Sequence, residues 1–100
     1  MDDKQFQKIA KALADPRRFK IFEMLAAKSE NGMCCGQVCD EFPVSQATIS
    51  HHLKELTEAG LIEPRSEGQF KFWSVQTDAI SDYISELQNR LQLSALTVKK

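Results

Sequence analysis

The sequence has no long hydrophobic run and no excess of charge of either sign. Nowhere do about 18 apolar residues follow one another, as a membrane-spanning helix requires, and the first residues lack the pattern of a signal peptide. We therefore expect a cytoplasmic protein with no membrane partner. The formal net charge is −1, so the overall charge does not by itself indicate nucleic-acid binding.

The patterns that carry most enzyme chemistry are also missing. The chain has no glycine-rich phosphate loop, no Gly-x-Ser-x-Gly turn and no convincing nucleophile–base pair, so we do not expect an enzyme. Paired Cys-x-x-Cys motifs, which would indicate tetrahedral zinc, are absent. Three cysteines in a cytosolic chain do not predict a disulfide framework, so thiol or metal chemistry has to be considered for them.

Apolar residues at helical spacing predict two helices in the first third of the chain. The first covers about residues 3–13. The second begins at Asp15-Pro16, because a capping acid followed by proline is typical of a helix start, and it ends near Asn31-Gly32. The side chains expected to face inward from the second helix are Phe19, Phe22, Leu25 and Ala26.

A tight turn is predicted to join two further helices. The third helix, about residues 34–42, has Cys34 at its N-cap and stops before Pro43. The fourth helix runs from a Ser45 cap to Ala59-Gly60, where glycine suits a left-handed C-terminal position. Its apolar side carries Ile49, Leu53 and Leu56, and its opposite side carries short polar side chains that can reach base edges in the DNA major groove.

β-prone residues replace the helical pattern after Gly60. Residues 61–63 and 70–75 are predicted strands, and the turn-forming residues 66–69 between them indicate a β-hairpin. A last helix follows from Asp78. The expected fold is mostly α with a small β-hairpin wing, an α+β winged helix-turn-helix. We expect residues 1–100 to form one domain, with its core at 15–75 and flanking helices at about 3–13 and 78–96.

The two flanking helices each carry an apolar stripe that a domain of this size is not expected to bury alone. Burying one Leu or Ile contributes about 1.5–3 kcal/mol, so leaving several exposed is costly. Pairing with the same helices of a second copy gives a symmetric homodimer, and the alternative is that the last helix folds back on its own domain. The expected interface residues are Phe6, Ile9, Leu13, Ile80, Tyr83, Ile84, Leu87 and Leu91.

Two segments carry the most specific signal in the chain. They are Ala-Leu-Ala-Asp-Pro-Arg-Arg-Phe at residues 12–19 and Ser-Gln-Ala-Thr-Ile-Ser-His-His-Leu-Lys-Glu-Leu at residues 45–56. Together with residues 59–62, Gly68 and residues 73–75, they make the chain similar to the ArsR/SmtB family of bacterial winged-helix repressors over roughly residues 6–90. The resemblance implies a homodimer that binds operator DNA through the fourth helix. Many members release DNA when a metal or metalloid binds, whereas others sense redox state or have no known ligand.

In such a dimer the two fourth helices lie one DNA turn apart, about 34–36 Å, and read a palindrome. Ser45 and the first-turn amides are expected to hold a phosphate, and Gln46 can pair bidentately with adenine. For each basic residue the alternative is a hydrated surface charge, and His52, next to the apolar side, is expected to be a buried structural histidine. The predicted DNA contacts are Ser45, Gln46, Thr48, Ser50, His51, Lys54, Arg65, Lys71 and Arg17.

The cysteines lie where the resemblance places the thiolate ligands of arsenic-sensing members, which carry Cys-x-Cys-x-x-Cys. Here Cys34 and Cys39 match the outer positions, Gly36 takes the middle one, and Cys35 lies one residue early. Three thiolates suit trivalent arsenic, antimony or another soft metal. The alternatives are that the thiols pack in the core or sense redox state. The zinc site that some relatives build on the last helix is not expected, because no histidine follows His52.

The pattern as a whole indicates a homodimeric, sequence-specific transcriptional repressor that binds operator DNA. A metalloid or metal at the cysteines is one mode of release, and the same fold with no metal response is the alternative. A winged helix that binds protein is the competing function, and the mildly acidic balance of residues 44–75 weakly supports it. A steep loss of DNA binding with rising salt would distinguish DNA binding from protein binding.

Overall fold

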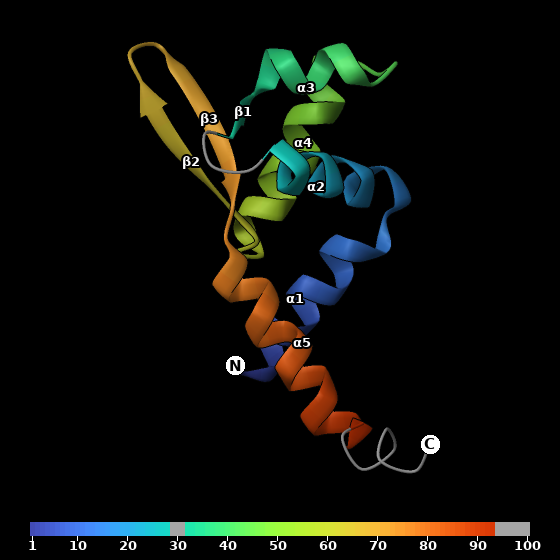
Figure 1. The fold of residues 1–100 in the computed structure, drawn as a ribbon. Helices are drawn as coiled ribbons and strands as arrows, with labels where there is room; N and C mark the ends of the chain where they lie inside the picture. The colour runs from blue at the N-terminus through green and yellow to red at the C-terminus, as the bar shows by residue number, and fades with distance from the viewer. Residues whose placement is uncertain (29–31, 94–100) are drawn as a thin grey trace.

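The computed structural model describes residues 1–28 and 32–93. In these residues a small antiparallel sheet projects from one side of the helical body, and the predicted winged helix-turn-helix is confirmed (Figure 1). The elements in chain order are α1 (Asp3–Ala14), α2 (Pro16–Lys28), β1 (Met33–Cys34), α3 (Cys35–Glu41), α4 (Gln46–Glu58), β2 (Ile62–Glu67), β3 (Phe70–Val75) and α5 (Thr77–Leu91). The expected extension of the second helix to Asn31 lies outside the described residues. The last helix ends at Leu91, earlier than the expected residue 96, because Gln92 adopts a left-handed C-cap conformation.

The helix starts follow the capping signals in the sequence. The backbone N–H of Arg18 donates to Asp15 Oδ1 at 2.9 Å, with Pro16 as the first residue of α2. The backbone N–H of Thr48 donates to Ser45 Oγ at 3.2 Å, so Ser45 caps α4 as predicted. Each cap satisfies a backbone donor that has no partner inside the helix.

The hydrophobic core lies between α2, α3 and α4 and extends to α1 and the start of β2. Its fully buried side chains are Ile9, Ile21, Leu25, Val38, Ile49, Leu53, Leu56, Leu61 and Ile62. Because these residues come from both sides of the helix-turn-helix, the core holds α3 and α4 at a defined angle.

The inward face of α2 differs from the prediction. Phe19 is 41% exposed and Ala26 is exposed, whereas Ile21 is fully buried. The buried seam follows positions 18, 21, 22 and 25, which places residues 19 and 26 on its solvent side at about 100° per residue. Apolar spacing alone does not separate these two registers, because Phe19, Phe22 and Ala26 also recur at helical intervals.

The sheet contains a strand that the sequence pattern did not predict. β1 has two residues and pairs with β3, so the strand order is β1-β3-β2, with Met33 opposite Trp73. β2 is also longer than expected and includes Pro64. Proline is tolerated there because β2 is an edge strand in this order. The wing is therefore attached to the start of α3 as well as to the end of α4.

Helices α1 and α5 lie side by side at the end of the molecule away from the wing (Figure 1). Arg90 Nη2 donates to Asp3 Oδ1 at 2.7 Å, and the rings of Phe6 and Tyr83 are 5.1 Å apart. No residue of α5 is fully buried, and Leu91 remains 57% exposed. The last helix thus contacts α1 of its own chain but keeps an apolar surface uncovered.

One expected interface residue is misplaced. Ile9 is fully buried inside the single chain, so it is a core residue and not a contact between two copies.

No helix within residues 1–28 and 32–93 has the length and apolar character of a membrane span.

Candidate nucleic-acid interface

The second helix of the helix-turn-helix, α4, separates a buried side from an exposed polar side. Ile49, Leu53 and Leu56 are buried as predicted, and they attach the helix to the core. Of the predicted DNA contacts on this helix, the exposed ones are Gln46, Ser50, His51 and Lys54. Because the core fixes the apolar side, the polar side of α4 is held outward.

Thr48 is less available than its neighbours. It is half-buried, and its Oγ1 lies 3.0 Å from Ser45 Oγ while its backbone N–H donates to the same oxygen. The threonine side chain therefore completes the helix cap. Ser45 itself is exposed at the helix start, where backbone N–H groups and the helix dipole favour an anion.

The wing brings one predicted basic residue next to α4. Lys71 of β3 lines a pocket of about 290 Å³ together with Ser50 and Lys54. It also lines a cleft of about 460 Å³ that includes Gln46. Residues from α4 and β3, about twenty positions apart in sequence, thus line both pockets, and we refer to this surface as the groove between α4 and the wing.

Arg65 lies on the other face of the hairpin. It is opposite Phe72 in the β2–β3 ladder, one position out of phase with Lys71, and side chains alternate along a strand. Its guanidinium lies 5.4 Å from the centre of the Phe72 ring and 3.5 Å from a Glu67 carboxylate oxygen. The structure therefore does not bring Arg65 together with the polar side of α4.

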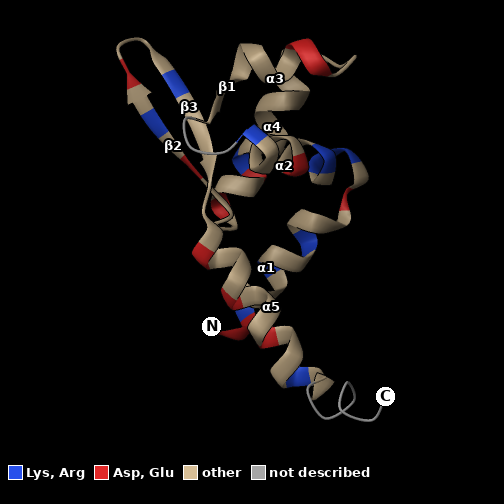
Figure 2. Ribbon diagram, viewed as in Figure 1, with Lys and Arg blue, Asp and Glu red and all other residues tan. Residues whose placement is uncertain are grey.

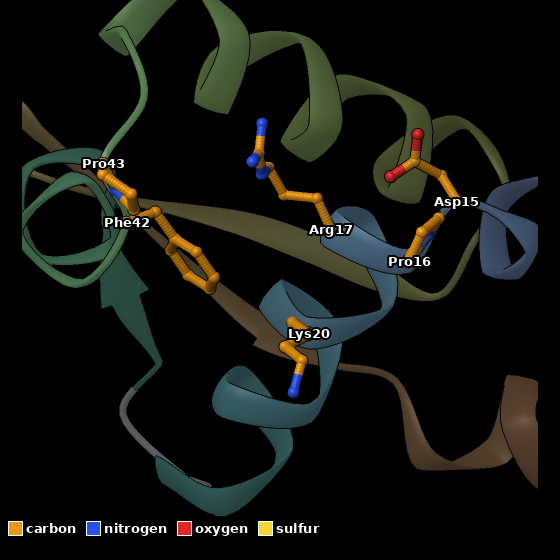
Figure 3. Close-up of a pocket in the computed structure, with 6 residues that line it drawn as sticks. All are labelled: Asp15, Pro16, Arg17, Lys20, Phe42 and Pro43. Atoms are coloured by element: carbon orange, nitrogen blue, oxygen red, sulfur yellow. The ribbon is translucent and has the colours of Figure 1, made fainter.

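A second basic surface lies at the start of α2. Arg17 and Lys20 line a pocket of about 490 Å³, which Phe42 and Pro43 of the α3–α4 turn close on the other side (Figure 3). Figure 2 shows that Lys and Arg residues gather here and on both strands of the wing. Arg17 is exposed and separate from the groove between α4 and the wing.

His52 lies at the inner side of α4 and is buried, as expected from its position beside the apolar seam. Arg18 Nε donates to His52 Nδ1 at 3.3 Å, and Arg18 Nη1 lies 3.4 Å from the backbone oxygen of Lys11. This arginine therefore connects the end of α1, the start of α2 and the middle of α4. The accepting Nδ1 requires a neutral imidazole with its proton on Nε2.

Burial is the main cause of the pKa shift of His52, whereas a backbone hydrogen bond is the main cause of the pKa shift of Asp15. Desolvation lowers the pKa of His52 below its ordinary value of 6.5, and the charge of Arg18 acts in the same direction, whereas Asp15 opposes it. The backbone N–H of Arg18 stabilises the carboxylate of Asp15 and lowers its pKa. Burial therefore favours a neutral imidazole, whereas the ionised Asp15 carboxylate favours its protonation and only partly offsets the burial.

The three cysteines are not assembled as a ligand set. Cys35 Sγ and Cys39 Sγ lie 3.9 Å apart on one side of α3, whereas Cys34 belongs to β1 and the helix N-cap. Among the described residues, no three Cys, His, Asp or Glu side chains lie close enough to hold a metal ion. Burial raises the pKa of the Cys39 thiol, with its contact to Cys35 as a further cause. The arrangement in this chain does not fit the three-thiolate site that the family resemblance implies.

Two residues at this surface were missed by sequence reasoning. Trp73 lines both pockets between α4 and the wing, and Arg18 is the link to His52. Trp73 could have been selected as the only tryptophan in the chain. Nothing in the sequence distinguishes Arg18 from Arg17, because their different roles depend on which side of α2 faces α4.

A helix-turn-helix with a β wing and an outward polar second helix defines a winged-helix DNA-binding protein. Residues 13–65 match a family described as a helix-turn-helix domain. An HTH-type transcriptional regulator of Methanocaldococcus jannaschii is 42% identical over 77 residues, covering 76% of this chain and 83% of that protein. The arsenical resistance operon repressor of Staphylococcus xylosus is 31% identical over 91 residues, covering 86% and 79% respectively.

The fold is also similar to that of solved structures. The homodimeric winged helix-turn-helix DNA-binding domain of Mycobacterium bovis aligns with a TM-score of 0.70 at 22% identity, covering 95% of this chain and 93% of that one. The chain belongs to the ArsR family of helix-turn-helix transcriptional regulators.

Proposed function

We propose that the chain is a repressor that binds operator DNA as a homodimer, with α4 in the major groove and the wing against the adjacent backbone. The observation that carries this proposal is the orientation of α4. Its apolar side is buried in the core, while Gln46, Ser50 and Lys54 are exposed beside Lys71 of the wing. These are the side-chain types that read base edges and neutralise phosphates.

The contacts divide by their chemistry. Gln46, Ser50 and His51 carry amide, hydroxyl and imidazole groups suited to base edges, whereas Lys54 and Lys71 supply positive charge for phosphates. Arg17 extends the basic surface to the start of α2. Arg65, on the far face of the hairpin, is proposed only as a contact at the edge of this surface.

The dimer is proposed to form through α1 and α5. The uncovered apolar surface of α5 includes Ile84, which is 51% exposed, and Leu91. Tyr83 and Ile80 are half-buried against the core and continue the same surface. The homodimeric state of the Mycobacterium bovis domain, which shares the fold, supports this arrangement. Two copies then present two α4 helices to one face of DNA.

The test is the salt dependence of DNA affinity, measured by fluorescence anisotropy with labelled duplex DNA. We expect log K to fall linearly with log salt, with a slope that counts the neutralised phosphates. Lys54→Ala and Lys71→Ala should each reduce that slope by about two per bound dimer, because each substitution removes one phosphate contact from each copy, and each should weaken binding uniformly across sequences.

Lys8→Ala is the matched control, because Lys8 is an exposed lysine on α1, away from the groove. It should leave both the slope and the affinity unchanged. A flat salt dependence, or equal effects of all three lysine variants, would contradict the proposal and favour a winged helix that binds protein.

A further inference from the structure

A cleft of about 460 Å³ between α3, the start of α4 and the wing contains two of the three thiols. It is lined by Cys34, Cys35, Gly36, Gln46, Gln69, Phe70, Lys71 and Trp73. Its volume falls within the range of about 300–1,000 Å³ that is typical of small-molecule sites. DNA contacts alone do not account for a cleft with cysteines on one side and aromatic residues on the other.

We propose that this cleft binds flat α,β-unsaturated carbonyl compounds, such as quinones, and that Cys34 or Cys35 adds to them covalently. Only the expected effect of the adduct on DNA binding rests on the proposed function. Gln46 and Lys71 line the cleft and are also proposed DNA contacts. An adduct in the cleft would occupy the space that α4 and the wing need to approach DNA.

The lining supplies each group that such a ligand requires. Phe70, 53% exposed, and the half-buried Trp73 offer aromatic faces for a flat conjugated ring. The side-chain amides of Gln46 and Gln69 can donate hydrogen bonds to carbonyl oxygens. The Lys71 ammonium places a positive charge in the same cleft, where negative charge develops on the oxygen during addition.

The three thiols are not equivalent. Cys34 and Cys35 line the cleft and are half-buried. Cys39 is not among the residues of the cleft, and burial raises the pKa of its thiol. Because the thiolate is the nucleophile, the reaction should occur at Cys34 or Cys35 and spare Cys39.

The reaction is a net addition of S–H across a conjugated C=C bond. The sulfur forms a bond to the β-carbon, the π electrons move to the carbonyl oxygen, and the enolate takes up the proton that the thiol released. With a quinone, the added ring rearranges to the hydroquinone thioether. No additional oxidant or reductant is consumed.

The effect on DNA binding follows from short distances. Cys35 Sγ lies 3.8 Å from Ser50 Oγ on the exposed side of α4, and Cys34 is opposite Phe72 in the sheet that carries the wing. A ring attached to Cys35 therefore lies against the exposed side of α4, and a ring attached to Cys34 lies in the cleft that Gln46 and Lys71 also line. The expected result is a lower affinity for DNA with no change in the oligomeric state.

The experiment compares p-benzoquinone with iodoacetamide, a thiol reagent that carries no conjugated ring. The full chain is treated with each reagent, and adducts are mapped by peptide mass spectrometry over time. We expect benzoquinone to label Cys34 or Cys35 at least about tenfold faster than Cys39. Phe70→Ala should slow benzoquinone labelling by about threefold or more while leaving the iodoacetamide rate unchanged.

Cys39→Ser is the matched control and should keep the wild-type labelling of the cleft, whereas the double variant Cys34→Ser, Cys35→Ser should lose it. DNA affinity is measured before and after labelling. Equal labelling of all three thiols, equal effects of Phe70→Ala on both reagents, or an adduct that leaves DNA affinity unchanged would overturn the proposal. If the untreated chain did not bind DNA, the proposed function would fail, and the labelling pattern would still decide whether the cleft recognises quinones.

Discussion

Two adjacent arginines at the start of α2 have different surroundings. Arg17 is exposed beside the α3–α4 turn, whereas Arg18 belongs to the buried seam and donates to His52. A helix turns by about 100° per residue, so neighbours in sequence face different parts of the molecule. The pair provides an internal comparison between Arg18, which contacts other parts of the fold, and Arg17, which is proposed to contact DNA.

We predict opposite effects for alanine at these two positions. Arg18→Ala should lower the free energy of unfolding by about 1–3 kcal/mol, because it leaves the buried His52 acceptor without its donor. Arg17→Ala should leave stability unchanged and weaken DNA binding. Chemical denaturation and anisotropy measure the two effects, and similar effects of both variants on stability would contradict this assignment.

His52 predicts a pH dependence of stability. Its pKa is lowered by burial from its ordinary value of 6.5, so below that pH the unfolded chain takes up a proton that the folded chain resists. Stability should therefore fall as the pH decreases from about 7 to about 5, and the loss is complete once the folded His52 also becomes protonated. The ionisation of Asp15 affects stability in a separate pH range. Its pKa is lowered from the ordinary value of 3.8, so its contribution to stability is lost only as the pH falls below that value.

The measurement is the free energy of unfolding across this pH range. His52→Gln should flatten the dependence between about pH 7 and pH 5. His51→Gln is the matched control, because His51 is exposed on the other side of α4, and it should retain the wild-type profile. An identical profile for both variants would show that the buried histidine does not control the effect.

At the scale of the elements, the attachment of the wing to α3 depends on a glycine. Gly32 has φ +73°, and a β-carbon there would overlap the backbone carbonyl of Trp73. The close approach lets β1 pair with β3 directly before α3 begins. A side chain at position 32 would separate β1 from β3.

We predict that Gly32→Ala destabilises the protein by more than about 1 kcal/mol, because it combines a left-handed backbone with a steric overlap. Gly36→Ala is the matched control. Gly36 lies in the first turn of α3, and a β-carbon added there would meet no atom within 4 Å, so alanine should stabilise slightly, by about 0.5 kcal/mol. Thermal denaturation of both variants tests the pair, and equal melting temperatures would refute the role of Gly32.

Some elements could be predicted from the sequence and others could not. The residues that determine an element lie next to it in some cases and far along the chain in others. Helix starts at Pro16 and Gln46 follow from caps two or three residues away, so they were predicted correctly. β1 has two residues, too few for a periodic pattern, and exists only because Trp73, forty residues later, pairs with Met33. β2 extends beyond the predicted residues 61–63 and includes Pro64, because the strand lies at the edge of the sheet, where the missing N–H is tolerated.

At the scale of the complete chain, α1 and α5 form an arm on which Ile84 and Leu91 of α5 are exposed apolar side chains. The contact between α5 and α1 within one chain relies on Arg90, which pairs with Asp3 and Glu86 and stacks 4.1 Å from the centre of the Phe6 ring. Leu91 on the same helix is left exposed. We therefore expect a second copy of the chain to cover the apolar side chains that α5 leaves exposed.

We predict that Leu91→Glu gives a monomer with weaker binding to a palindromic duplex, because a charge cannot be buried against an apolar partner without a large cost. Asn89→Glu is the matched control, since Asn89 lies on the opposite, exposed side of α5. Sedimentation velocity measures the oligomeric state, and a Leu91→Glu variant that remains dimeric would contradict the proposed interface.

Local sequence signals were enough to predict the order of the helices, the hairpin and the polar side of α4, because caps and periodicity act over a few residues. The family followed from the resemblance carried by residues 12–19 and 45–56. Packing between elements set which apolar residues are core and which are surface, as the burial of Ile9 and the exposure of Phe19 illustrate. It also separated Lys71 from Arg65 and placed Cys34 and Cys35, but not Cys39, in the cleft beside the wing. Those distinctions depend on the rotation of each element about its own axis, which is set by the partners it packs against and not by local spacing.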